Sequence, residues 1–318
     1  MRIAFRGALA GALLLGAVGL TAPSTAEAAY PEKSITFVVP FAAGGGTDRW
    51  ARGMAAVSEK HFGQMFKVVN VPGAQGITGW RHLLAQPADG YTFMMGSSTL
   101  NLALAVNPNP ALKHSDIKVA TIISAFPVLM LVKPGSEWST FEGLKKYAAA
   151  NPNKLVVGGT LSNLIGVADF VKQAGIQVRL VPYNSSSDAT TDFLGGHIHA
   201  YGSPPAAAQP LVPEKATPVF VTNDEPVDLA GFENVPTSKS LGFESMTMPR
   251  WIGMHPDTPD DIVNGFVKRL DTLMNDPAVM EPLLKTGEEV YVLPRAEAER
   301  RYERMVVQLT EASKLLQK

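Results

Sequence analysis

Short runs of β-branched and aromatic residues alternate with stretches of helical periodicity from residue 34 onward, and this alternation constrains the fold more than any other feature. The segments that predict strands are 34–39, 67–70, 91–96, 154–158 and 177–181. The segments that predict helices are 47–62, 77–86, 163–174 and 187–194, with a further helix that a Ser139-x-x-Glu142 capping box begins. Repeats of this kind form βαβ units, so we predict an α/β fold built on parallel strands.

Two apolar segments are too long for one ordinary strand and lie at junctions between these sections. They are residues 119–132 and 247–254. The chain has 318 residues, which is more than one hydrophobic core usually organises. We therefore expect two lobes with a cleft between them. Residues 29–126 and 251–318 form the discontinuous first lobe in this prediction, and residues 127–250 form the second.

The first 28 residues have the pattern of a cleaved secretory signal peptide. Arg2 and Arg6 precede an apolar stretch over residues 8–20, and Ala26-Glu27-Ala28 provides small residues at a cleavage site. The alternative is a membrane anchor, but this stretch is shorter than the ~20 residues that a spanning helix needs. We predict an exported chain, cleaved after Ala28, whose mature part does not insert into the membrane.

Composition excludes several classes of function. The 28 Lys and Arg residues nearly balance 29 Asp and Glu residues, and no block of like charges interrupts the chain, so nucleic acid is not an expected partner. The absence of cysteine excludes disulfides, thiol catalysis and cysteine-ligated zinc. We predict no cofactor.

The most informative motif is the loop at residues 40–48, Pro-Phe-Ala-Ala-Gly-Gly-Gly-Thr-Asp, between a predicted strand and a predicted helix. Glycines let a ligand approach the backbone closely, and a helix N-terminus offers unpaired N–H groups with a partial positive charge. The combination predicts an anion site, although neither nucleotide-binding fingerprint fits. The alternative interpretation is a turn in which Thr47 or Asp48 caps the helix.

Three more loops occupy the same kind of position, after a predicted strand and before a predicted helix. They are residues 70–76, 158–163 and 182–188. Open α/β sheets place ligands at the carboxyl ends of their strands, so these loops are candidate walls of one site.

Enzyme signatures are absent from the sequence. It contains neither H-E-x-x-H nor G-x-S-x-G, and the one close histidine pair, His197-x-His199, is expected on one face of a strand without an acidic partner nearby. We predict no catalytic residue and no metal site. An exported enzyme acting on an anionic metabolite, or a ligand sensor for a membrane signalling partner, stay open as alternatives to a binding protein.

The mature chain resembles, over essentially its whole length, the solute-binding proteins of tripartite tricarboxylate transporters, the Bug family. The motifs that carry the resemblance are Tyr30-Pro31, the loop 40–48, Pro72-Gly73-Ala74 with Gly76, Asp89-Gly90-Tyr91-Thr92, Val181-Pro182-Tyr183, the segment 192–196, Val235-Pro236-Thr237, Trp251-x-Gly253 and Thr258-Pro259. The resemblance implies a Venus-flytrap fold of the periplasmic binding protein type. It also implies a monomeric periplasmic protein that closes on a small organic carboxylate and delivers it to the permease subunits of such a transporter.

The resemblance places the ligand between the first-lobe loop and loops of the second lobe. The implied ligand-binding residues are Phe41, Ala42, Gly44, Gly45, Gly46, Thr47 and Asp48 from the first lobe and Gly159, Thr160, Ser162, Asn163, Asn184 and Ser185 from the second. Arg49 and Ser97 are candidate specificity residues. Arg49 stands at the start of a predicted helix, where a cation opposes the helix dipole, so it is a candidate contact for a second negative group on the ligand. A solvated surface position is the alternative.

Overall fold

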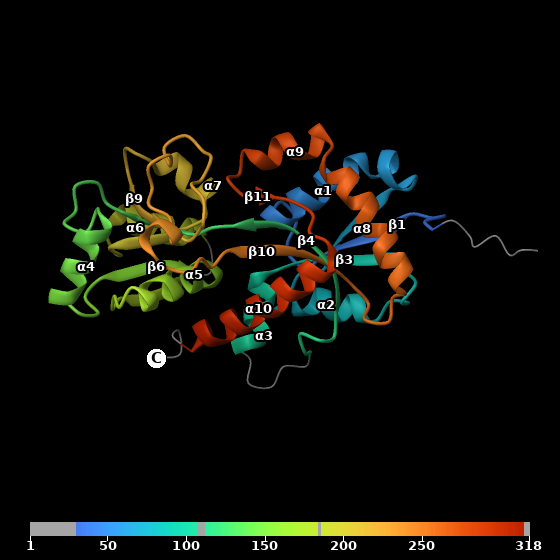
Figure 1. The fold of residues 1–318 in the computed structure, drawn as a ribbon, viewed down its shortest axis with the longest axis horizontal. Coiled ribbons are helices and arrows are strands. Elements are labelled where there is room, and N and C mark those ends of the chain that lie inside the picture. The colour runs from blue at the N-terminus through green and yellow to red at the C-terminus, as the bar shows by residue number, and fades with distance from the viewer. Residues whose placement is uncertain (1–29, 107–111, 184–185, 315–318) are drawn as a thin grey trace, which may run out of the picture. The chain divides into compact units, whose positions relative to one another are not determined.

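The computed structural model describes residues 30–106, 112–183 and 186–314 of the chain, and residues 31–318 form one compact unit. The described strands of this unit make two mixed sheets (Figure 1). The first sheet has the order β11-β4-β10-β3-β1-β2, formed by Glu289–Val290, Lys118–Phe126, Met248–Met254, Thr92–Ser97, Ile35–Val39 and Phe66–Asn70. The second has the order β7-β6-β8-β5-β9, formed by Arg179–Tyr183, Val156–Thr160, Ala200–Ser203, Leu129–Val132 and Thr217–Val221. The predicted α/β fold with two lobes is confirmed.

Both sheets combine parallel and antiparallel pairs, whereas the alternation in the sequence predicted parallel strands. In the first sheet β1 is parallel to β2 and β3, but β10 is antiparallel to both β3 and β4. In the second sheet β6 is parallel to β7 and β8, and β5 is antiparallel to β8 and β9. The parallel pairs follow the local βαβ repeats, and the antiparallel strands are those joined by longer connections.

Helices cover the sheets. The described α-helices are α1 (Gly46–Phe62), α2 (Ile77–Leu84), α3 (Ser98–Val106), α4 (Phe141–Ala150), α5 (Leu161–Gln173), α6 (Ser186–Gly195), α7 (Pro205–Ala208), α8 (Asp260–Met274), α9 (Pro277–Leu284) and α10 (Arg295–Ser313), with 3-10 turns at Ala74–Gly76, Gln209–Leu211 and Lys239–Leu241. The helix after residue 139 begins differently from the prediction. Thr140, and not Ser139, is its N-cap, because the Thr140 side chain accepts a hydrogen bond from the backbone of Gly143.

The long apolar segment 119–132 contains two strands rather than one. β4 ends at Phe126 in the first sheet, and β5 begins at Leu129 in the second. The chain returns to the first sheet along β10, which lies beside β4 in Figure 1 and pairs with it from Met248 onward. The exact residue limits predicted for the lobes stay a prediction.

Aromatic packing fixes the elements that precede the loop 40–48. Phe37 on β1 and Phe93 on β3 are fully buried with ring centroids 4.2 Å apart, and Phe266 of α8 packs on Phe93 at 4.8 Å. Burying one such side chain contributes ~1.5–3 kcal/mol to stability. The carboxyl end of β1 is therefore held by this packing where the loop begins.

None of the helices in the described ranges combines the length and apolarity needed to cross a bilayer.

Candidate functional site

A cavity of about 680 Å³ lies between loops of the two sheets. From the first-sheet side it is lined by Phe41, Gly45, Gly46, Thr47, Gln75, Ser97, Thr99, Phe126 and Arg250, and from the second-sheet side by Thr160, Leu161, Ser162, Pro182 and Tyr183. Each of the four loops predicted from the sequence contributes at least one wall residue. The carboxyl ends of strands from both sheets therefore converge on one space, which we call the cleft.

The predicted site residues divide into those that line the cleft and those that do not. Phe41, Gly45, Gly46, Thr47, Ser97, Thr160 and Ser162 line it. Ala42, Gly44, Asp48, Gly159 and Asn163 are not among its lining residues, and Asn184 and Ser185 lie outside the described residues. Arg49 lines a neighbouring cavity of about 470 Å³ between α1 and α9, which shares Gly46, Phe126 and Arg250 with the cleft.

The start of α1 forms the polar wall of the cleft on the first-sheet side. Gly45 is the N-cap and provides no side-chain cap, so the first N–H groups of this 17-residue helix have no intrahelical partner. These groups carry the positive end of the helix dipole. Because Gly46 and Thr47 line the cleft, an anion there meets backbone donors and a favourable field.

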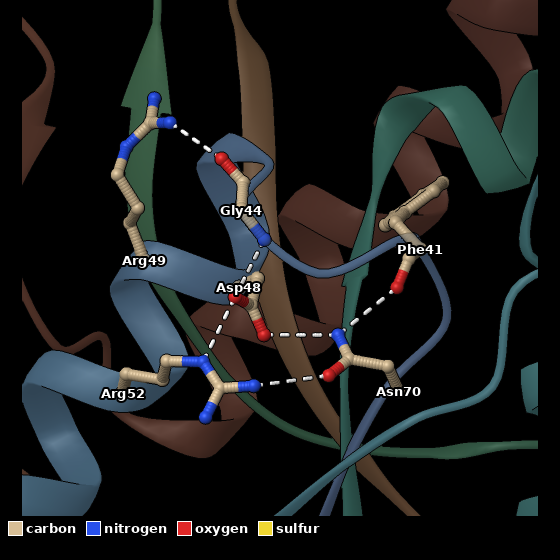
Figure 2. A network of polar contacts seen from close by, with 6 residues as sticks. All are labelled: Phe41, Gly44, Asp48, Arg49, Arg52 and Asn70. Atoms are coloured by element: carbon tan, nitrogen blue, oxygen red, sulfur yellow. Dashed lines mark hydrogen bonds and ion pairs between the residues drawn. The ribbon is translucent and has the colours of Figure 1, made fainter.

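Asp48 organises the loop instead of lining the cleft (Figure 2). Its Oδ2 accepts hydrogen bonds from the Gly44 backbone at 2.8 Å and from Arg52 Nε at 2.9 Å, and its Oδ1 accepts from Asn70 Nδ2 at 2.9 Å. In the alternative interpretation Thr47 or Asp48 caps the helix, but the N-cap of α1 is Gly45 and neither side chain caps the helix from that position. Asp48 reaches backward to Gly44 and fixes the approach to the helix.

Asn70 and Arg52 complete this network. Asn70 begins the loop 70–76 that the sequence analysis named as a candidate wall, but neither residue was among the predicted ligand-binding residues. Asn70 Nδ2 also donates to the Phe41 carbonyl at 3.1 Å, and Arg52 Nη2 donates to Asn70 Oδ1 at 3.2 Å. The Asp48 and Arg52 spacing of four residues on one helix was a usable signal for an ion pair. The contact between β2 and the loop had no local signal.

The carboxyl group of Asp48 stays ionised. The hydrogen bond from Arg52, together with those from Gly44 and Asn70, lowers the pKa of Asp48 to about 2, although burial acts in the opposite direction. Its negative charge is compensated by Arg52 and by the N–H donors of Gly44 and Asn70, and Asp48 does not line the cleft.

On the second-sheet side the polar groups are more loosely engaged. Thr160 Oγ1 and Ser162 Oγ lie 3.4 Å apart, whereas buried Asn163 donates from Nδ2 to the Gly202 carbonyl at 3.2 Å. Tyr183 donates its hydroxyl to Asp192 Oδ2 at 2.6 Å, and burial together with this carboxylate raises the pKa of Tyr183 to about 12. Tyr183 therefore presents a neutral side chain, and the hydrogen bond between the Thr160 and Ser162 hydroxyls is at the limit of hydrogen-bond distance.

Among the described residues that line the cleft, Arg250 is the one that carries a charge, and the sequence analysis did not single it out. It lies on β10, all of whose residues are buried, and its Nη1 reaches Thr47 Oγ1 at 3.4 Å. An arginine in the middle of the otherwise apolar segment 247–254 was the signal that could have found it.

The histidine pair lies in a different structure from the one predicted. His197 and His199 are in the turn between α6 and β8 and not on a strand. His199 Nδ1 accepts a hydrogen bond from the backbone of Val156 at 3.2 Å, so this ring is part of the packing of the second sheet.

Comparisons of the sequence and of the structure with known proteins find the same kind of relative. A family model described as the tripartite tricarboxylate transporter family receptor matches residues 50–314. Protein BugT of Bordetella pertussis is 25% identical over 285 residues, which cover 86% of each chain. A TctC solute-binding protein from Polaromonas superposes with a TM-score of 0.77 at 24% identity, covering 91% of this chain and 99% of the other. An R. palustris protein determined with adipate gives a TM-score of 0.74 at 24% identity, covering 90% and 97%.

Proposed function

This chain belongs to the tripartite tricarboxylate transporter receptor family, and on that premise we propose that it is a periplasmic solute-binding protein for a small organic carboxylate. In this proposal the two lobes close on the ligand in the cleft. The protein then delivers the ligand to the membrane permease of a tripartite tricarboxylate-type transporter. It acts as a monomer and does not change the ligand chemically.

The observation that carries this proposal is the uncapped start of α1 at the wall of the cleft. Gly46 and Thr47 belong to the first turn and line the cavity, so their N–H groups are available to carboxylate oxygens. A hydrogen bond to a charged group contributes ~1.5–3 kcal/mol, and micromolar binding requires about 8 kcal/mol. Three or four such contacts account for most of that affinity.

The opposing hydroxyls support the same ligand class. Thr160 and Ser162 line the same cavity from the second-sheet side and can donate to a carboxylate or to a polar group elsewhere on the ligand. The cavity of about 680 Å³ suits a small molecule. The R. palustris relative determined with adipate adds that this fold accepts a dicarboxylate.

Thermal unfolding with a ligand panel tests the proposal. The protein is stripped of bound ligand and heated with di-, tri- and aromatic carboxylates, each paired with the primary amide of the same skeleton. A carboxylate present at a hundred times its Kd stabilises the folded state by ~2.7 kcal/mol, and its amide should stabilise much less. No response to any carboxylate in a broad panel would reject the proposed function.

Two further measurements separate binding from catalysis. The stabilising carboxylate should be recovered chemically unchanged after long incubation at stoichiometric concentration, and conversion to a product would favour the enzyme alternative. Solution scattering should show a smaller radius of gyration when that carboxylate is added, because lobe closure makes the molecule more compact.

A further inference from the structure

The guanidinium of Arg250 is buried at the wall of the cleft, where it pairs with the equally buried carboxylate of Glu288. β10 is paired on both sides, with Arg250 opposite Ser97 of β3 and Ser124 of β4. The Arg250 side chain is 11% exposed, and removing a charged group from water is costly unless the charge is compensated. A buried arginine at the wall of a binding cavity is therefore a candidate for function.

Three neighbours fix the orientation of the guanidinium. Glu288 accepts from Nε at 3.0 Å and from Nη2 at 2.8 Å, which is the two-point geometry of an arginine–carboxylate pair. The guanidinium carbon lies 5.6 Å from the ring centroid of Trp50 and 5.2 Å from that of Phe126, within cation–π range of both. Glu288 thus holds one edge, and the aromatic rings restrain the plane.

The end of the guanidinium that carries Nη1 and Nη2 lies near the start of α1. Nη1 lies 3.4 Å from Thr47 Oγ1, and Nη2 lies 3.7 Å from the position that a Cβ atom would take at Gly46. A guanidinium has five N–H donors, of which Glu288 takes two and Thr47 a third at the limit of hydrogen-bond distance. For the remaining two, the part of the chain that the structure describes provides no acceptor.

This placement opposes the helix dipole when the cleft is empty. A cation beside a helix N-terminus is unfavourable, and Glu288 compensates the charge only from the far edge. A carboxylate in the cleft would complete the arrangement, because it accepts from both the α1 backbone and Arg250.

We propose, on the basis of the function proposed above, that Arg250 contacts the ligand carboxylate directly and that Glu288 is its positioning residue. Arg250 then makes the cleft selective for a charged carboxylate over a neutral isostere. Backbone amides alone bind both an anion and an amide carbonyl, whereas a fixed guanidinium favours the anion.

Paired variants test this assignment. R250Q/E288Q removes the ion pair without leaving one buried charge alone. The control K118Q/D260N removes the 2.9 Å ion pair of Lys118 with Asp260, and with it the contact of Asp260 with Arg295, away from the cleft and with the same change in net charge. Calorimetry gives the Kd of each variant for three pairs of a carboxylate and its amide. The pairs are adipate with adipamide, benzoate with benzamide, and the most stabilising carboxylate of the thermal panel with its own amide.

The proposal predicts that R250Q/E288Q weakens carboxylate binding about ten- to hundredfold, as expected for a lost charge-assisted hydrogen bond, while amide binding changes little. The control keeps the wild-type ratio of carboxylate to amide affinity. An unchanged ratio in folded R250Q/E288Q overturns the role of Arg250 and leaves the proposed function intact. Wild-type protein that binds no carboxylate overturns both.

R250K provides a second variant in case the double variant does not fold. Lysine keeps the charge of the strand but cannot pair with Glu288 and a ligand through one planar fork. The proposal predicts a reduced carboxylate-to-amide ratio, and wild-type selectivity in R250K would contradict it.

Discussion

Asn70 donates its side-chain amide to Asp48 Oδ1 at 2.9 Å and thereby connects the last residue of β2 to the first turn of α1. The same amide nitrogen donates to the Phe41 carbonyl at 3.1 Å. One side chain thus holds both ends of the loop whose Gly45 and Gly46 line the cleft. The ligand-binding shape of that loop depends on residues that do not line the cleft.

Replacing Asp48 by alanine should destabilise the protein and weaken ligand binding together. The variant removes the acceptor of Gly44, Arg52 and Asn70, and the loss of a charge-assisted hydrogen bond corresponds to about 1.5–3 kcal/mol of unfolding free energy. Urea unfolding and calorimetry measure the two effects. D228A, at an exposed aspartate, is the control. Wild-type binding in D48A would contradict the organising role.

The same carboxylate predicts an acid-dependent loss of stability. The pKa of Asp48 is about 2 in the folded protein, below the ~3.9 of an unfolded chain. Its contribution is therefore complete above pH ~4 and is lost as the pH falls toward 2. The difference in unfolding free energy between wild type and D48N should shrink over this interval. A difference that does not vary with pH would show that the charge of Asp48 is not stabilising.

Gly45→Val should abolish carboxylate binding without unfolding the protein. Gly45 has φ −72° and ψ 172°, an extended conformation that valine adopts readily, so the backbone is not strained. Its Cβ would lie 3.3 Å from the Ala42 carbonyl oxygen, a tight contact that a small shift of the loop relieves, and the added methyl groups reduce the space at the wall of the cleft that Gly45 lines. G265V on α8, where an added Cβ meets no atom within 4 Å, is the matched control. Near-wild-type carboxylate affinity in folded G45V would show that this loop does not bind the ligand.

Arg49 provides a test of ligand charge that is separate from the test of Arg250. Arg49 is exposed, donates from Nη1 to the Gly44 carbonyl at 2.8 Å and lines the cavity between α1 and α9. If it meets a second negative group, R49A should weaken binding of dianions by roughly fivefold, which corresponds to about 1 kcal/mol for an exposed pair. R49A should change the affinity for monoanions much less. The control R81A should leave the affinity for dianions nearly unchanged. Equal losses for both ligand classes would contradict this role.

The sequence was most informative where structure is set locally. The strand, glycine loop and helix from Ile35 to Phe62 form as predicted because periodicity, glycine and helix-start signals all lie within thirty residues. Within each sheet the two predicted loops lie together because the carboxyl ends of parallel strands share an edge. That both pairs line one cavity depends on the packing of the two sheets, which no local pattern encodes.

Long-range pairings could not be predicted in the same way. Arg250 meets Glu288 and Thr47, which are 38 and 203 residues away in the chain, only after β10 inserts between β3 and β4. The antiparallel insertion depends on the packing of the whole sheet and leaves no local pattern. The choice between Ser139 and Thr140 as a helix cap is a difference of one residue that backbone geometry decides.

The central claim is that a carboxylate binds at the start of α1 inside the cleft. A ligand titration followed by backbone amide NMR tests this claim most directly. Isotope-labelled protein is titrated with the carboxylate that gives the largest thermal shift and, separately, with its amide. We predict that the carboxylate causes the largest shifts at the N–H groups of Gly45, Gly46 and Thr47, with a second group at residues 160–162. The amide should cause smaller shifts. Unchanged signals at Gly46 and Thr47 under saturating carboxylate, or shifts confined to residues outside the cleft, would contradict the account.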